Sequence, residues 1–362
     1  MKTKKRHLVI LMTLLALLAF RTKASFAQTN WASETITGTV TKNFSGTVNL
    51  NGKITVDGGT LTINNTSTTE PLYIKRNFND NNGTEADMFL IKNNGKIIIK
   101  ETEATRIIFD GNGKTGRCFH LYSRTGDNKS TELNLEYVTI QKMKPQSPGT
   151  GSGQSTTSMS GLAIYVNWDS SVGAKYSTTY KNYVRSFHVN IDDCGDAKPT
   201  SETAIGGGNT DCAIRLTASA YCPFDMSYCN ITNNRGTRTY SGVFCAGGPT
   251  VCCLLNMDNC TCSGNYSSGW GGFLLWAGGN SYAATAVVEG TIPTAKAIIT
   301  NCRFENNEAG YAGGAISSEG TVDLSNNTFV GNHAKVGGAL SAFPYTNASD
   351  DDLEVCGINL LG

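Results

Sequence analysis

Two groups of acidic residues have the types and spacing that acid–base chemistry needs. Asp192 and Asp193 are adjacent, and Asp211 ends the sequence Asn209-Thr210-Asp211. Two carboxylates on neighbouring coils of one chain could donate and accept protons at a glycosidic bond. Acids that cap loop turns explain the same residues, because an aspartate side chain bonds nearby backbone groups. We consider this structural interpretation the stronger one and predict no catalytic residues; Asp192, Asp193 and Asp211 are the candidates for the alternative, an enzyme.

Other reactive side chains form no recognisable site in the sequence. His120, His188 and His333 are scattered, with no nucleophile at a recognised spacing from any of them. The acidic run at 350–352 is interpreted as a solvated loop. A phosphate-binding loop, a Rossmann fingerprint and an RNA-binding aromatic signature are all missing from the sequence. We therefore expect no cofactor, no metal ion and no nucleic-acid partner.

A motif repeated within residues 299–341 indicates the element that must position any site. The pattern is apolar-x-Asn-x-x-Phe-x-x-Asn-x-Ala, followed by Gly-Gly-Ala-apolar-Ser, and its two copies lie about 25 residues apart. A repeat of this length is one supersecondary unit that must stack on a neighbour to bury its apolar face. The repeated positions are Asn301, Phe304, Asn307, Gly313, Gly314 and Ala315, then Asn326, Phe329, Asn332, Gly337, Gly338 and Ala339.

The pairing of Phe-x-x-Asn with Gly-Gly-Ala and an aliphatic residue resembles the repeats of polymorphic outer membrane proteins. Those repeats belong to right-handed parallel β-helix passenger domains of surface proteins in Gram-negative bacteria. The resemblance implies an all-β chain folded as a right-handed, single-stranded parallel β-helix, with a minimal rung of about 25 residues and loop insertions. A rung is one turn of this coil.

Each repeated residue has a structural explanation. In a parallel coil the apolar first position and the Phe position should both point inwards, on two faces separated by a bend. Asn301 and Asn326 can form a ladder at that bend, because asparagine tolerates left-handed backbone and bonds neighbouring peptides. Asn307 and Asn332 can do the same at the next bend. Paired glycines allow a tight corner, and the following alanine keeps a narrow interior from being overfilled.

The same pattern, moved backwards along the chain, locates earlier rungs and a set of cysteines. The first position falls on Leu135, Ile191, Met226, Met257, Ile299 and Leu324. Three residues after four of these positions stand Cys194, Cys229, Cys260 and Cys302. We expect these cysteines to form one column of buried thiols, since free cysteine behaves as a small apolar residue. Disulfides remain an alternative, because rungs are about 4.8 Å apart, although in-register stacking seldom gives suitable torsions.

Loops between rungs are where a solenoid usually places its ligand-facing residues. We predict loops at 141–160, 167–183, 196–211 and 278–295, all rich in small and polar residues. The second loop carries Trp168, Tyr176, Tyr180 and Tyr183. Exposed aromatic rings could hold a sugar or a protein partner, but packing of these rings onto the flank of the coil is the stronger interpretation.

The first 27 residues have the features of a secretory signal peptide. Four basic residues precede an apolar run at 8–20, and Ser25-Phe26-Ala27 is a small-x-small cleavage site. The run is too short to span a bilayer as a helix. Removal of residues 1–27 leaves 24 basic and 29 acidic residues, a net charge of −5, and no basic stripe for nucleic acid. We expect export to the cell surface, the outer membrane or the extracellular space.

The predicted domain organisation is a cap with the first rungs at 28–130 and a repeat-containing β-helix at 131–362. Another strand begins near the end, at 355–361, and no polar cap follows it. We therefore expect a fragment of a longer protein, whose missing C-terminal region could associate with the outer membrane.

The expected function is adhesin-like binding or display without catalysis, with a host or microbial surface protein or glycan as the partner. The alternative is a polysaccharide lyase or glycoside hydrolase on a β-helix. Asn209-Thr210-Asp211 and Asp192-Asp193 resemble two motifs of polygalacturonases, in reversed order and without the Gly-His-Gly and Arg-Ile-Lys motifs.

Overall fold

The structure is an all-β parallel β-helix. The computed structural model describes residues 28–79, 87–124, 129–145, 161–169, 176–177, 181–195, 212–217, 222–236, 242–247, 253–276, 288–289, 296–342 and 358–361. Three parallel sheets of ten strands each stack along one axis, and the described residues form no helix. The predicted fold class is therefore confirmed.

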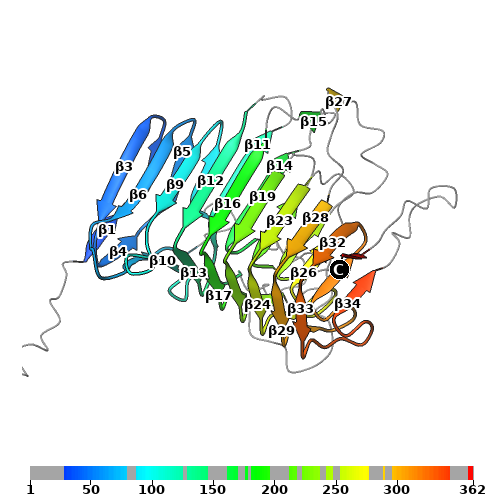
Figure 1. The fold of residues 1–362 in the computed structure, drawn as a ribbon. Coiled ribbons are helices and arrows are strands. Elements are labelled where there is room, and N and C mark those ends of the chain that lie inside the picture. Colours follow the sequence, from blue (N-terminus) through cyan, green and yellow to red (C-terminus); the bar gives the residue numbers. More distant parts are fainter. Residues whose placement is uncertain are drawn as a thin grey trace, which may run out of the picture.

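Every rung contributes one strand to each sheet in turn (Figure 1). Sheet 1 consists of β1 (Thr29–Trp31), β4 (Thr47–Leu50), β7 (Leu72–Arg76), β10 (Ile107–Asp110), β13 (Val138–Gln141), β17 (Asn190–Asp192), β20 (Asn230–Thr232), β24 (Thr261–Ser263), β29 (Arg303–Glu305) and β33 (Thr328–Val330). Sheet 2 consists of β2 (Glu34–Ile36), β5 (Ile54–Asp57), β8 (Asp87–Lys92), β11 (Arg117–Arg124), β14 (Ile164–Asp169), β18 (Ile214–Thr217), β22 (Phe244–Gly247), β26 (Leu274–Trp276), β31 (Ile316–Ser318) and β34 (Leu340–Ala342). Sheet 3 consists of β3 (Thr39–Phe44), β6 (Thr60–Asn65), β9 (Lys96–Lys100), β12 (Thr131–Glu136), β16 (Asn182–Phe187), β19 (Cys222–Ser227), β23 (Cys253–Asp258), β28 (Lys296–Thr300), β32 (Thr321–Ser325) and β35 (Ile358–Leu361).

Two small sheets accompany the three long ones. One pairs β15 (Tyr176–Ser177) with β27 (Val288–Glu289). The other, sheet 4, follows sheet 1 along the chain and consists of β21 (Arg235–Gly236), β25 (Tyr266–Ser267) and β30 (Glu308–Ala309). The three long sheets run across the domain boundary expected at residue 130. The predicted signal peptide, residues 1–27, lies outside the described residues, among which no helix is long and apolar enough to cross a membrane.

The interior is filled by columns of apolar side chains, because successive residues of a strand face opposite sides of the sheet. Near the N-terminal end, Phe89, Phe109 and Phe119 contact one another with ring centroids 5.1 to 5.5 Å apart. Near the other end, Phe304 is fully buried and stacks on Phe329 at 4.9 Å. The predicted inward Phe position is therefore confirmed.

The register of the repeat is right for five of the six predicted first positions. Leu135 aligns with Ser186, Ser186 with Met226, and the column continues through Met257, Ile299 and Leu324. Ile191 was assigned to this column wrongly: it lies in sheet 1, between Ile140 and Ile231. The error has a physical cause, since Ser186 is a polar residue at a buried position and the apolar pattern does not reveal it.

The repeated glycines form the corner that leads into sheet 2. Gly313 has a φ of +66° and Gly337 one of +58°, a region that favours glycine. Gly314 has another reason: a Cβ there would lie 2.0 Å from the carbonyl oxygen of Gly338. Ala315 is fully buried beside this corner and Ala339 half-buried, as the narrow interior requires.

Candidate functional site: an aromatic corner beside an open groove

The corner between sheet 3 and sheet 1 repeats one unusual backbone conformation. The residue after each of six consecutive sheet-3 strands has a φ between +52° and +55°: Tyr137, His188, Tyr228, Asn259, Asn301 and Asn326. Asparagine adopts this left-handed region readily, whereas a bulky side chain there costs about 1–2 kcal/mol. The two tyrosines and the histidine are therefore strained, and residues held under strain often have a functional role.

The three strained side chains stack on one another across successive rungs. The rings of Tyr137 and His188 are 4.6 Å apart and nearly parallel, at 8°, and those of His188 and Tyr228 are 5.2 Å apart at 18°. Phe187 meets all three rings edge-on, with centroid distances of 4.4 to 6.1 Å. Tyr228 is 47% exposed. We call Tyr137, Phe187, His188 and Tyr228 the aromatic corner.

Arg106 fixes the backbone beneath this corner. Its Nη1 donates to the carbonyl oxygens of His188, at 2.9 Å, and of Val138, at 3.0 Å. Its guanidinium also lies 5.8 Å from the ring centroid of Tyr137. The aromatic corner is thus held rigidly, which lowers the entropy cost of binding a partner.

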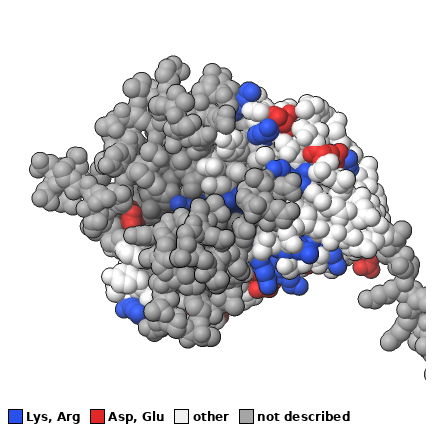
Figure 2. All heavy atoms as spheres, turned by 180° about the vertical axis from the view of Figure 1, so that it is seen from behind, with Lys and Arg blue, Asp and Glu red and all other residues white. Residues whose placement is uncertain are grey.

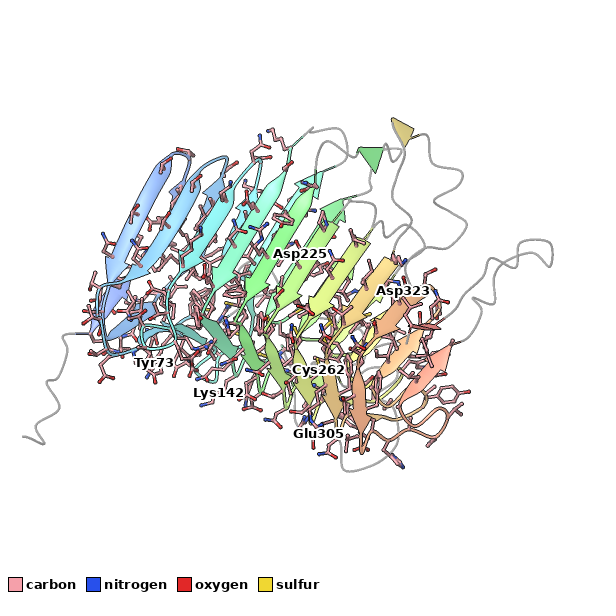
Figure 3. All side chains as sticks on the ribbon, in the orientation of Figure 1. Tyr73, Lys142, Asp225, Cys262, Glu305 and Asp323 are labelled. Carbon is pink, nitrogen blue, oxygen red and sulfur yellow. The ribbon has the colours of Figure 1, made fainter. Side chains whose placement is uncertain are left out.

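An open groove of about 430 Å³ lies next to the aromatic corner on the outer face of sheet 3. Its lining combines the ring of Phe187 with polar side chains, among them Glu136, Arg185, Asp225, Asn256, Asp258 and Thr300. Figure 3 shows Asp225 on this face, with Asp323 further towards the C-terminal end. The groove therefore offers carboxylate, amide, guanidinium and hydroxyl groups beside an apolar edge.

Hydrogen bonds hold the groove carboxylates in place. Asp225 accepts one from the hydroxyl of Tyr183, at 2.9 Å, and one from Nδ2 of Asn256, at 2.8 Å. Asp258 accepts one from Nδ2 of Asn301 at 2.8 Å, and this bond lowers the pKa of the Asp258 carboxyl. Asp258 is therefore ionised at neutral pH and serves as a fixed acceptor.

The predicted aromatic loop between 167 and 183 is shorter in the structure. Trp168 lies in β14 and Tyr176 in β15, and β16 already includes Tyr183. Tyr183 is a sheet residue: its hydroxyl also accepts a bond from Arg185 at 2.6 Å, and Lys181 lies 5.6 Å from its ring. Tyr180 and the side chains of Trp168 and Tyr176 lie outside the described residues.

Two acidic candidates for catalysis lie at the end of a sheet-1 strand: Asp192 is the last residue of β17, and Asp193 follows it. Asp192 accepts hydrogen bonds from Oγ1 of Thr232, at 2.6 Å, and Nδ2 of Asn233, at 3.0 Å. Asp193 occupies the next position, in the left-handed conformation with a φ of +52°. Asp211 lies outside the described residues.

An asparagine ladder, predicted from Asn307 and Asn332, extends over four rungs at the bend after sheet 1. Nδ2 of each asparagine donates to Oδ1 of the next: Asn234 to Asn265, Asn265 to Asn307 and Asn307 to Asn332, over 2.9 to 3.1 Å. Each Nδ2 also donates to a carbonyl of the preceding rung. At the other bend Asn301 and Asn326 have the predicted left-handed backbone, but the side chain of Asn301 bonds Asp258 of the preceding rung.

The thiol column contains three of the four predicted cysteines. Cys229, Cys260 and Cys302 follow the stacked first positions, and the backbone bonds Thr261 N to Cys229 O and Arg303 N to Cys260 O keep them in register. Cys194 was placed in this column wrongly, since its backbone N donates to Oδ1 of Asn234, at the start of the asparagine ladder. The error follows from the wrong assignment of Ile191. All ten cysteines in the described residues are buried.

The buried thiols predict a loss of stability at alkaline pH. Burial raises the pKa of Cys118 well above its usual range and that of Cys194 to about 12. Unfolded thiols titrate near pH 8.5, so the contribution is complete below about pH 8.5 and is lost as pH rises towards the folded pKa. Each such thiol should cost about 1.4 kcal/mol per pH unit in that window. Urea unfolding in reductant, at about pH 8 and about pH 10, measures the decrease in the free energy of unfolding between the two pH values. In Cys118→Ala this decrease should be smaller than in the wild type by about 2 kcal/mol. An equal loss in both proteins would contradict this assignment.

The sequence contains a signal for the aromatic corner. Tyr137 and Tyr228 stand two residues after the first positions Leu135 and Met226, where later rungs have asparagine. His188 completes the set only when Ser186 is recognised as a first position. No protein-family model, curated protein or solved structure matches this chain.

Proposed function

We propose that this protein is an exported, surface-exposed binding scaffold that holds a glycan on the outer face of sheet 3 and performs no catalysis. The observation that carries the proposal is the aromatic corner: three bulky side chains in strained backbone, stacked at the edge of a polar groove. A purely structural corner would use asparagine, as the next three rungs do. The resemblance of the repeats to polymorphic outer membrane proteins supports the surface location, which is part of the proposal.

The chemistry of the groove favours a glycan over a flat protein surface. A sugar presents hydroxyl groups to carboxylate, amide and guanidinium side chains, and its C–H faces to aromatic rings. Here Asp225 and Asp258 supply acceptors, Arg185 supplies donors, and Phe187 supplies a ring. Tyr228 lies 5.8 Å from the ring of Phe187 and adds an exposed ring beside the groove. The residues that line the groove come from five successive strands of sheet 3, β12, β16, β19, β23 and β28, so a polymer can contact several rungs at once. Many weak contacts then add up to useful avidity.

The alternative, a lyase or glycoside hydrolase, would use Asp192, Asp193 and Asp211. Asp192 accepts two hydrogen bonds at the end of β17, which supports a structural role for that carboxylate. An enzyme would generate new reducing ends or unsaturated products from a polysaccharide panel, which a binding scaffold leaves intact.

Replacement of Tyr228 by asparagine should separate binding from stability. We expect Tyr228→Asn to weaken glycan binding at least about tenfold, because the exposed ring of the corner is lost. The free energy of unfolding should change by less than about 1 kcal/mol, since relief of the left-handed strain offsets the lost stacking. A glycan array identifies ligands for the purified chain, and calorimetric titration of the best ligand compares the variants.

Tyr311→Asn is the matched control for this experiment. Tyr311 is also exposed, at 51%, and stacks on Trp270 at 5.1 Å, away from the groove. The Tyr311→Asn variant should bind the ligand with the affinity of the wild type. Equal loss of binding in both variants, or binding only to a protein ligand, would refute the glycan site. An array without ligands together with cleavage of a polysaccharide would favour the enzyme.

A further inference from the structure

The outer face of sheet 2 carries a column of half-buried and buried side chains that point away from the core. Strand register aligns Leu90, His120, Tyr165, Arg215, Cys245, Leu275 and Ser317. Cys245 and Ser317 are fully buried and Leu275 is 4% exposed. Cys212 and Trp270 pack with Cys245 and Leu275 in a second apolar cluster, separate from the core. Figure 2, which views the molecule from behind, shows that basic and acidic side chains both occur on the described part of that side.

Arg215 is a cation in this covered column without an anionic partner among the residues described. Its Nη1 donates to the thiol sulfur of Cys245. The titratable groups that act electrostatically on Arg215 are Cys245, Cys212 and Tyr165, and none of them is a carboxylate. Burial raises the pKa of Cys245, so the sulfur that Nη1 contacts is a neutral thiol at physiological pH. Arg215 as a whole is half-buried, but its Nε is shielded from solvent. A shielded edge of a cation without a counter-charge is costly, which indicates that an anion belongs here.

The geometry of the guanidinium specifies which edge would take that anion. Nη1 is engaged by Cys245, whereas Nε is buried and has no hydrogen-bond partner within the described part of the chain. Nε and Nη2 form the edge that binds a carboxylate through two parallel hydrogen bonds. Glu319 is not its partner, since burial raises the pKa of the Glu319 carboxyl and no cation lowers it.

The two rungs that precede Arg215 add polar and charged side chains next to it. Tyr165 is one rung from Arg215, and its ring lies 4.6 Å from the guanidinium of Arg117 and 4.7 Å from the ring of His120. Nδ1 of His120 is 2.9 Å from Oδ2 of Asp87, while its Nε2 is buried with no partner among the described residues. Burial alone would raise the pKa of Asp87, but the charges and hydrogen bonds of His120 and Arg117 hold it well below its usual range. The charge of Asp87 is thus already matched, and Asp87 does not compensate Arg215.

We propose that Arg215 anchors a binding site for a carboxylate-bearing ligand, such as an acidic sugar, on the outer face of sheet 2. Tyr165 and His120 line the same site on the N-terminal side of Arg215. The site is separate from the groove on sheet 3, and it does not depend on the function proposed for that groove.

Thermal unfolding at constant ionic strength tests the proposal on the purified chain. Galacturonate should raise the Tm by about 2–4 °C at a concentration about tenfold above its Kd, while galactose and chloride should not. Acetate should act like galacturonate if the carboxylate alone is recognised, and sulfate and phosphate should act more weakly because they lack the planar fork. Arg215→Met should abolish the shift. Arg303→Met, which removes an exposed arginine, and Cys245→Ser should keep it.

Arg215→Lys is a second variant for the case in which Arg215→Met does not fold. It keeps the charge but removes the two-bond edge, so the Kd for galacturonate should rise at least about tenfold while the fold remains. The proposal is overturned if no carboxylate shifts the Tm of the wild type, or if the arginine variants shift as the wild type does. Rapid alkylation of Cys245 at neutral pH would also overturn it, since a thiolate would then be the counter-charge of Arg215.

Discussion

Replacement of Asn307 by alanine should lower the free energy of unfolding by about 3–5 kcal/mol. The side chain of Asn307 makes four hydrogen bonds inside the coil. Its Nδ2 donates to Oδ1 of Asn332 and to the carbonyl of Cys262, and its Oδ1 accepts from the backbone N and the Nδ2 of Asn265. Alanine removes all four bonds. Nδ2 of Asn265 keeps its bond to the carbonyl of Ile231, and Oδ1 of Asn332 keeps the backbone N of residue 307, but the backbone N of Asn265 loses its Oδ1 acceptor and the carbonyl of Cys262 loses its amide donor. A buried polar group left unsatisfied costs about 1–3 kcal/mol before relaxation. Urea unfolding followed by circular dichroism measures the change.

Asn230→Ala is the matched control for the ladder. Asn230 also links two rungs, since its Nδ2 donates to Oδ1 of Asn190 at 3.0 Å, but it is exposed. Water can replace that bond, so the cost should stay below about 1 kcal/mol. Hydrogen exchange should further show that Asn307→Ala loosens the rungs of Asn265 and Asn332 first, because a solenoid is stabilised between nearest neighbours. If both substitutions lower the free energy of unfolding equally, burial of the ladder contributes nothing to stability.

The sequence was sufficient for those parts of the fold in which residue type and position are tightly coupled. Phe304 and Phe329 fill the same interior position, Gly313 and Gly337 need left-handed backbone, and Asn307 requires amide neighbours above and below. Each of these requirements excludes most other residues. A motif that meets all of them therefore predicts both the coil and its register over the last rungs.

Prediction failed where a polar residue occupies an interior position. Ser186 is 1% exposed and takes the place of Leu135 and Met226 in the column. Apolar periodicity cannot detect Ser186, and the repeat pattern matches Ile191 instead, which belongs to the next face. That single displacement also moved Cys194 into the wrong column. Register in a parallel coil is a collective property, so one misplaced residue shifts everything assigned relative to it.

The candidate sites were hidden for a different reason. The groove of sheet 3 is formed by outward side chains from several rungs, and the anion site of sheet 2 by residues as distant in sequence as His120 and Arg215. Neither has a local motif, because the coil brings together residues that are one or two rungs apart. In the sequence His120 was an isolated histidine, and only the strand register places it two rungs from Arg215.

Replacement of Gly314 by alanine should destabilise the coil by about 3 kcal/mol or more. The added Cβ would lie 2.0 Å from the carbonyl oxygen of Gly338 and 2.6 Å from the backbone N of His333. Both atoms belong to the backbone of the next rung, so no side-chain rotation relieves the contact, and the stacking distance of the two rungs must increase.

Gly38→Ala provides the control, because a Cβ at Gly38 meets nothing within 4 Å, and its effect should stay within about 0.5 kcal/mol. The strain at Gly314 acts between rungs, so its cost should appear as early unfolding of the C-terminal rungs in hydrogen exchange, with the rungs before Cys260 protected as in the wild type. A Gly314→Ala protein as stable as Gly38→Ala would mean that the rungs are not packed at the spacing on which the repeat, the ladder and both proposed sites depend.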